Sequence, residues 1–196
     1  MTKVRNINFG PLLVVTATSL LLAACTTGVA VTGPTYLSSI YSQDMLLGVS
    51  AQGGMALKVK GAPFTSRQPG IADQIAEIFT NNHFGPSFQV YATPPAKLKE
   101  AYRTFVVFNP DPGLSGDAVC AEKSDPAKVA PEAGKVRLLA VFCEYQVAQT
   151  STVGRVQADG PSDPRYIALL QQVSHDLWPP LIGDMNRSNN QAEWPD

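Results

Sequence analysis

The sequence predicts an α+β domain, in which two amphipathic helices pack on one face of a mostly antiparallel sheet of about four strands. Two observations predict this class. Several short segments are apolar throughout or alternate between apolar and polar residues, as strands do, whereas two other segments repeat their apolar residues with the period of a helix. The segments follow one another as strand, helix, several strands and helix, with no internal repeat.

The first strand and the first helix are predicted at residues 55–60 and 71–82. Residues 55–60 alternate between apolar and polar side chains and end at Gly61. From residue 71 onward the apolar side chains fall on one side of a helical wheel, opposite Asp73 and Glu77. The change of period from two residues to about 3.6 predicts a short helix that packs on a sheet.

The remaining strands are predicted in the middle of the chain. Residues 88–91 predict a short edge strand, and residues 103–109 predict a central strand because they are apolar on both faces. Residues 136–145 form the strongest strand pattern of the chain. Residues 152–158 are expected to pair with them as a hairpin, through a connection at residues 147–151.

A long loop and a final helix complete the predicted domain. Residues 110–135 contain several prolines and show no periodic pattern, which predicts a surface loop. Asp163 is a good N-cap and Pro164 a favoured first residue for the helix, which ends before Trp178. Its apolar face is made of Tyr166, Leu169, Leu170, Val173 and Leu177. The single domain is therefore expected to span residues 55–182, and residues 183–196 form a polar C-terminal tail.

The N-terminus has the pattern of an export signal. Lys3 and Arg5 are the only charged residues among the first 24, and an apolar run with small residues at its end follows them. The run at residues 11–24 is shorter than the ~20 apolar residues of a membrane-spanning helix. Residues 1–24 are therefore predicted to be a signal peptide.

The end of this signal, Leu22-Ala23-Ala24-Cys25, resembles the lipobox of bacterial lipoproteins. The resemblance implies cleavage before Cys25, a diacylglycerol thioether on its sulfur and an amide-linked acyl chain such as palmitate on its new N-terminus. Two or more acyl chains anchor a protein stably, whereas one does so only marginally. The alternative is an ordinary signal peptide with a chance cysteine at its end.

The lipobox resemblance also implies a location. Thr26 stands where an aspartate would retain a lipoprotein of enteric bacteria in the inner membrane, so the periplasmic face of the outer membrane is expected, with the inner membrane as the alternative. Cleavage would remove Lys3 and Arg5 and no acidic residue, which changes the formal charge from −1 to −3. Residues 25–54 are predicted to be an acylated tether, and their apolar side chains indicate that part of it packs on the domain.

With Cys25 acylated, the remaining cysteines form an even pair, Cys120 and Cys143. In an oxidising periplasm such a pair most simply forms a disulfide. The bridge would close a loop of 24 residues, counted from Cys120 through Cys143, which is worth roughly 3 kcal/mol on a chain-entropy model. A redox or nucleophilic cysteine is the alternative, although redox pairs usually stand two residues apart.

The sequence contains no recognisable catalytic or cofactor-binding constellation. Nucleophile-elbow and phosphate-loop motifs are absent, and two histidines with a bridged cysteine pair cannot supply the three or four ligands of a zinc site. His175 is expected to be solvated, opposite the apolar face of its helix, and His83 to end a helix. The acids of the long loop are expected to be solvated, although two of them could approach in space; they are Asp111, Asp117, Glu122 and Asp125. No catalytic residue, metal site or cofactor is therefore predicted.

The mature region resembles small alphaproteobacterial lipoproteins over about residues 55–180. The resemblance is carried by Lys58-Val59-Lys60-Gly61-Ala62-Pro63-Phe64, by Thr104-Phe105-Val106-Val107-Phe108-Asn109-Pro110 and by Asp163-Pro164-Arg165-Tyr166. It implies an α+β domain with two cysteines and carries no activity with it.

These patterns predict a periplasm-facing lipoprotein that acts as a binding or interaction module in the cell envelope. Its partners would be the membrane, through the acyl chains on Cys25, and an envelope protein or peptidoglycan. Nucleic acid is excluded because the net charge is −1 and no basic stripe is present. Two alternatives stay open: an envelope hydrolase that uses two carboxylates, and a carrier of a small apolar ligand, which would need an enclosed apolar pocket.

Overall fold

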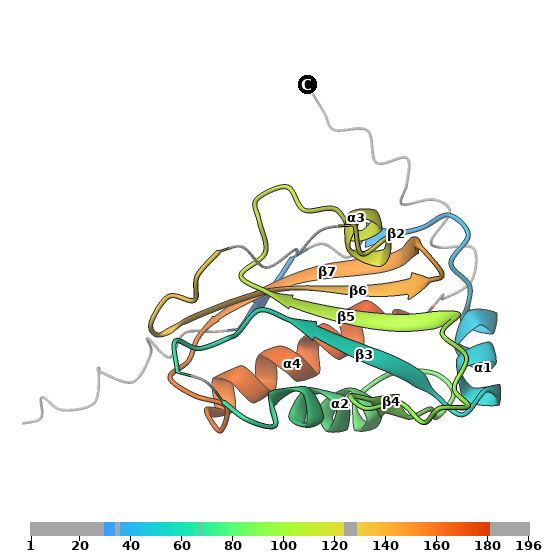
Figure 1. Ribbon diagram of the computed structural model, residues 1–196, viewed down its shortest axis with the longest axis horizontal. Helices are drawn as coiled ribbons and strands as arrows, with labels where there is room; N and C mark the ends of the chain where they lie inside the picture. Colours follow the sequence, from blue (N-terminus) through green and yellow to red (C-terminus); the bar gives the residue numbers. More distant parts are fainter. Residues whose placement is uncertain (1–29, 34–35, 67, 124–128, 181–196) are drawn as a thin grey trace, which may run out of the picture.

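The computed structural model describes residues 30–33, 36–66, 68–123 and 129–180 (Figure 1). Within these residues it is an α+β fold, with one mixed sheet of seven strands and four helices. The predicted signal peptide at residues 1–24, the acylation site at Cys25 and the polar tail at residues 183–196 lie outside the described residues. Those three predictions therefore stay predictions.

The sheet is built around five strands in the order β7-β6-β5-β3-β4. Strands β5 (Tyr102–Phe108), β6 (Lys135–Glu144) and β7 (Val147–Gln157) are antiparallel neighbours, but β3 (Met55–Lys60) runs parallel to both β5 and β4 (Val90–Tyr91). The predicted mostly antiparallel sheet of about four strands is therefore right only in part, because β3 pairs in parallel and the sheet has seven strands. Helix α2 (Ile71–Asn81) lies between β3 and β4 in the chain, and a helical connection of this kind returns the chain in the same direction.

Two very short strands complete the sheet at its other edge. β1 (Val31–Thr32) and β2 (Tyr36–Leu37) both pair antiparallel with β7, and α1 (Gln43–Ala51) follows them. In the register, Val31 is opposite Arg155 and Tyr36 is opposite Ser151. From residue 30 onward, the described part of the predicted tether therefore belongs to the folded domain.

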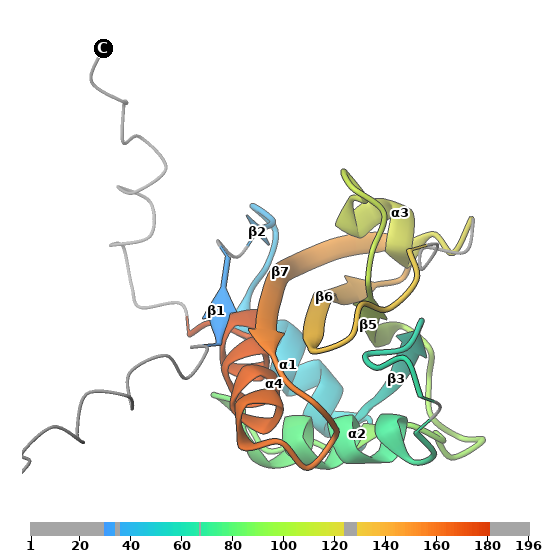
Figure 2. The same ribbon diagram turned by 90° about the vertical axis from the view of Figure 1, so that its left-hand side faces the viewer.

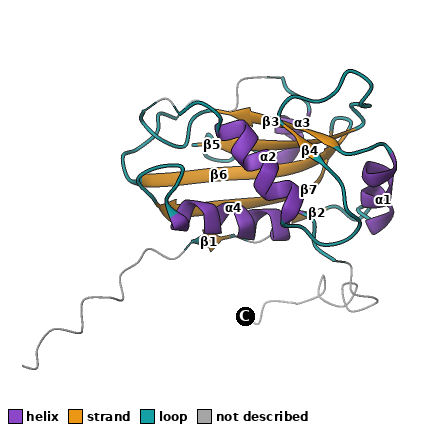
Figure 3. Cartoon of the chain, turned by 90° about the horizontal axis from the view of Figure 1, so that it is seen from below, coloured by secondary structure: helices purple, strands orange, loops and turns teal. Residues whose placement is uncertain are grey.

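The inner face of the sheet is covered by helices. Figures 2 and 3 show α2 and α4 (Pro164–Leu177) lying across this face, as the sequence predicts, and α1 adds Leu46 and Val49 to the same core. The largest fully buried side chains of this core are Trp178, Tyr166, Phe79, Phe108, Phe142, Leu46, Met55, Ile75, Leu138, Leu169 and Leu170. The burial of so many large apolar groups, at about 1.5–3 kcal/mol each, is the main source of the domain's stability.

Helix α4 starts and ends where the sequence predicts. The carboxylate of Asp163 accepts a hydrogen bond from the backbone N–H of Arg165 at 2.9 Å, which caps the helix, and Pro164 is its first residue. The helix also approaches β7 closely at Gly154, where a Cβ atom would stand 2.8 Å from Cδ1 of Leu169. The missing side chain therefore lets α4 pack tightly against the sheet.

Two predicted connections contain regular structure. Strand β7 begins at Val147, so residues 147–151 are not the hairpin connection; the turn is Tyr145-Gln146, with Tyr145 at φ 52°. The predicted long loop at residues 110–135 contains a short helix, α3 (Gly116–Cys120). The predicted edge strand at residues 88–91 is shorter than expected, because only Val90–Tyr91 pair with β3.

Candidate functional site

The outer face of the sheet, opposite α2 and α4, is covered only in part (Figure 2). A small second core forms where α3 packs on β5, β6 and β7, and its buried members are Phe105, Val107, Val119, Cys120, Leu139, Val141, Cys143 and Ala148. Cys120 and Cys143 form a disulfide with their Cα atoms 5.7 Å apart. The bridge attaches α3 to β6, so the cysteine pair that the sequence predicts has a structural position here.

An ion network lies beside this disulfide. Glu122 accepts a hydrogen bond from the Lys58 ammonium at 2.9 Å and one from the Arg103 guanidinium at 2.6 Å. Burial raises the pKa of the Glu122 carboxyl, but the hydrogen bond and charge of Lys58, together with the charges of Arg103 and Lys60, outweigh it. The pKa therefore lies below its ordinary value, and the carboxylate stays ionised.

Arg103 is the centre of this network. Its guanidinium is almost fully buried and also donates to the backbone carbonyls of Cys120, at 3.2 Å, and Tyr145, at 2.5 Å. It thereby connects the end of α3 with the β6–β7 turn and lies 5.6 Å from the ring centroid of Phe105. Because its contacts are with backbone carbonyls and side chains of this chain, we assign Arg103 a structural role.

The acids of the predicted loop also serve the fold. Asp117 accepts a hydrogen bond from the backbone N–H of Ala148 at 2.8 Å, and Glu122 belongs to the ion network. Asp111 lines a groove described below, and Asp125 lies outside the described residues. A general acid needs a raised pKa, whereas the described carboxylates with a shifted pKa, at Glu122, Glu132 and Asp163, are all shifted downward.

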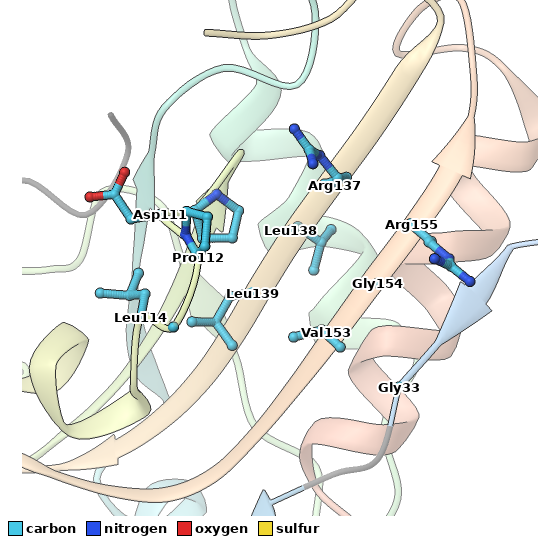
Figure 4. A pocket seen from close by; sticks show the side chains of 12 residues that line it. Gly33, Asp111, Pro112, Leu114, Arg137, Leu138, Leu139, Val153, Gly154 and Arg155 are labelled. Atoms are coloured by element: carbon cyan, nitrogen blue, oxygen red, sulfur yellow. The ribbon is translucent and has the colours of Figure 1, made fainter. Parts of the chain in front are cut away.

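An open groove of about 460 Å³ lies on the outer face, between β6, β7 and the loop that follows β5 (Figure 4). Leu114, Leu139 and Val153 provide its apolar floor, and Arg137 and Arg155 lie near one end, with their guanidinium groups pointing away from each other. The other lining residues are Gly33, Pro110, Asp111, Pro112, Gly113, Leu138 and Gly154. Its volume is in the range of small-molecule sites.

Two features of the chain shape the groove. Asn109 has a left-handed backbone at φ 49°, and its buried side chain donates to the carbonyl of Ala62 at 2.8 Å. This turn directs the loop at residues 110–114 over β6. On the other side, a Cβ atom on Gly33 would stand 2.4 Å from Cγ2 of Val153, so glycine is required for this close approach to β7.

The electrostatics of the groove follow from the strand register. Arg137 of β6 and Arg155 of β7 are directly opposite each other, and Leu139 and Val153 are the next pair on the same face. Like charges in directly opposite positions destabilise a sheet. Both side chains are exposed, and neither is in an ion pair with a carboxylate in the described part of the chain. The arginine pair therefore places two positive charges beside an apolar floor.

Two other depressions, of about 530 Å³ each, adjoin each other at the opposite end of the sheet. They share Lys99, Ala101 and Tyr145, and Lys97 lines one of them. The acidic residues Glu100 and Glu144 stand among these cations, so the charges there are mixed. Because these opposite charges offset one another, we regard this region as the weaker candidate.

The two histidines belong to an aromatic cluster on the inner side. His83 stacks on Phe88 with ring centroids 3.9 Å apart, and the ring of His175 lies 4.5 Å from that of Phe84. His175 was expected to be solvated, but it is half-buried, because the segment after α2 folds over the last turn of α4. The amide of Asn82 holds this segment by donating to the carbonyl of Gln171 at 2.7 Å.

Among the described residues, no group of three or more histidine, cysteine or acidic side chains could hold a metal ion. In the same part of the chain, no helix has the length and apolar character needed to cross a membrane. The sequence did not reveal the groove, because its two arginines are 18 positions apart and only the register of β6 and β7 brings them together. The only signal for the groove in the sequence was the presence of one arginine in each of the two strands predicted to pair as a hairpin.

No protein-family model matches the chain. No curated protein matches it either. Among solved structures, the chain is similar to PelC of Paraburkholderia phytofirmans, described as a dodecamer in two crystal forms, one of them with a single substitution. In both cases the identity is 11%, the TM-score is 0.40, and the match covers 78% of this chain and 99% of that chain. At this level the similarity assigns neither a family nor a function to the chain.

Proposed function

We propose that this chain is an exported envelope protein, acylated at Cys25, whose domain is a binding module that uses the outer-face groove. The observation that carries the binding role is the groove itself. It combines an apolar floor at Leu139 and Val153 with two arginines that have no ion-pair partner in the described part of the chain. Like charges in directly opposite positions destabilise a sheet, so a binding role accounts for the presence of both arginines there.

The geometry favours binding over the two alternatives from the sequence. The groove is open to solvent along the sheet, whereas a carrier would enclose its apolar ligand in a pocket. A hydrolase would need two carboxylates free to exchange protons, but Asp117 and Glu122 are occupied by a backbone N–H and by two cations. The location follows from the lipobox resemblance alone: the periplasmic side of the envelope, with the outer membrane favoured by Thr26.

Acylation is tested by labelling cells with radioactive palmitate. The wild-type chain should incorporate the label, and Cys25→Ala should abolish incorporation. Label that persists in Cys25→Ala would contradict acylation at this residue.

The binding role of the groove is tested by complementing a strain in which the gene is deleted. Val153 and Val147 are both 48% exposed and both belong to β7, but only Val153 lines the groove. Val153→Glu should therefore fail to restore the envelope integrity of the strain, measured as detergent sensitivity, whereas Val147→Glu should restore it at an equal level of folded protein. Equal rescue by both variants would refute the groove as the functional site.

A further inference from the structure

We infer that the groove binds an anionic phospholipid of the anchoring membrane, with the phosphate between Arg137 and Arg155 and an acyl chain along Leu139 and Val153. This inference rests on the proposed function, because it takes the groove as the binding site and Cys25 as the anchor. It adds the chemical class of the ligand and the source that supplies it.

The first argument is the arginine pair. Arg137 and Arg155 are directly opposite in the β6–β7 register and exposed, and Asp111 is the one acidic residue among the described residues that line the groove. A guanidinium presents its N–H groups in a planar fork that matches two oxygens of a phosphate. Figure 4 shows the two exposed side chains pointing apart, so both guanidinium groups bind one phosphate only when they turn toward it, and the ligand then offsets the repulsion between the paired positions.

The second argument is the position of the apolar floor. Leu139 and Val153 are the cross-strand pair next to the arginines on the same face, and Leu114 packs beside them from the loop (Figure 4). Val153 stays 48% exposed. A free phosphate would use only the arginine end of the groove. A ligand with a phosphate joined directly to a hydrocarbon chain uses both parts, and this is the construction of a phospholipid.

The third argument is the length of chain between the anchor and the groove. Val31 of β1 is the cross-strand partner of Arg155, and Cys25 precedes it by six residues. Six residues span at most about 20 Å when fully extended. An acylated Cys25 therefore keeps the arginine end of the groove within a short distance of the membrane surface. This tethering raises the effective concentration of lipid headgroups at the site.

The inference is tested by binding of soluble short-chain lipids to the full chain purified from the membrane fraction in a neutral detergent. The probes are dihexanoyl phosphatidylglycerol, dihexanoyl phosphatidylcholine and inorganic phosphate, and native mass spectrometry measures their occupancy. We expect phosphatidylglycerol to bind at least about tenfold more tightly than the zwitterionic lipid and than phosphate alone. The double variant Arg137→Gln/Arg155→Gln should lose at least about tenfold in this affinity.

The matched control is Lys97→Gln/Lys99→Gln, which removes the same charge from exposed positions at the opposite end of the sheet. It should bind phosphatidylglycerol as the wild type does. Equal loss in the two double variants would overturn the inference, because it would reduce the effect to overall charge. Equal binding of both lipids, or phosphate binding as tight as that of phosphatidylglycerol, would overturn the assignment of an anionic lipid.

The failures of the two proposals can be told apart. If Val153→Glu fails to complement the deletion strain but phosphatidylglycerol does not bind to the groove, the ligand class is wrong and the binding module stands. If Cys25 takes up no palmitate, the anchor is wrong, and the binding of the short-chain lipids still tests the groove independently of the anchor. Retention of phosphatidylglycerol by both the arginine double variant and Val153→Glu would overturn the inference outright.

Discussion

The inner and outer faces of the sheet are lined by alternating residues of the same strands, yet they differ in packing, in covering helices and in charge. On β6, Leu138, Ala140 and Phe142 point into a core that α1, α2 and α4 close, whereas Arg137 and Leu139 face the groove. The inner face is held by continuous apolar packing. The outer face is held by one disulfide, one ion network and a small core, and it tolerates a pair of like charges. The comparison separates the part of the domain that stabilises it from the part that is available for binding.

The largest expected effect is on the inner face. Trp178 is fully buried and contacts Phe79 and Phe142, with ring centroids 5.6 and 6.5 Å away. Trp178→Ala should lower the free energy of unfolding by about 3–5 kcal/mol, because it leaves a large cavity. Urea unfolding followed by circular dichroism measures this, with Val147→Ala at an exposed site as the control. A loss below about 1 kcal/mol would mean that the inner core does not dominate stability.

The disulfide is expected to be the next largest contribution, and it belongs to the outer face. Cys120→Ser/Cys143→Ser should lower the free energy of unfolding by about 3 kcal/mol, the value for a loop of this length. Hydrogen exchange should show faster exchange in α3 while the amides of β5 and β6 stay protected. Unchanged exchange in α3 would contradict the bridge as the element that holds the outer face together.

The ion network should make stability depend on acid pH. The folded pKa of Glu122 lies below its ordinary value of 4.5, so the stabilisation is present above about pH 4.5 and is lost as pH falls through the folded pKa. Glu122→Gln should therefore lower the Tm at neutral pH, and its Tm should fall less than that of the wild type on acidification.

The control for this prediction is Glu132→Gln. Glu132 also pairs with a lysine, Lys135 at 2.6 Å, but both side chains are 54% exposed, so its effect on the Tm should be smaller. If acidification changes the Tm of the two variants alike, the position of Glu122 beside the disulfide does not increase its contribution to stability.

The smallest expected effect has the opposite sign. Arg155→Gln removes the repulsion across the β6–β7 pair, so it should raise the free energy of unfolding by about 0.5 kcal/mol or less. The gain should shrink at high salt, which screens exposed charges. Chemical unfolding at low and high salt measures it, with Lys97→Gln as a control expected to change nothing. A loss of stability would mean that Arg155 serves the fold.

The elements that the sequence predicted well are those with long and regular patterns. Strands β3, β5 and β6 and helices α2 and α4 each bury an apolar face or both faces, and burial decides their structure. β7 was placed too late because its first residues include Gln149 and Thr150, which are polar but fully buried. Thr150 donates its hydroxyl to the carbonyl of Leu177, and a partner at such a distance in the sequence cannot be seen from local composition.

Other features could not be predicted from the sequence for the same reason, because they depend on contacts between distant parts of the chain. β1 and β2 have two residues each and exist only because β7 supplies their hydrogen-bond partners. The half-burial of His175 depends on the segment at Asn82 that crosses α4. The parallel pairing of β3 with β5 joins residues more than forty positions apart, such as Ala56 and Arg103.

The sequence by itself determined the α+β class and the two principal helices, because period and capping are local properties. It predicted the pairing of Cys120 with Cys143 on the condition that Cys25 is acylated, and the structure shows this disulfide. It also predicts the export signal and the acylation of Cys25. The tertiary structure alone decided the strand order, the partly covered outer face and the groove. A groove is made by residues that meet only through strand register, and register is set by the packing of the whole sheet.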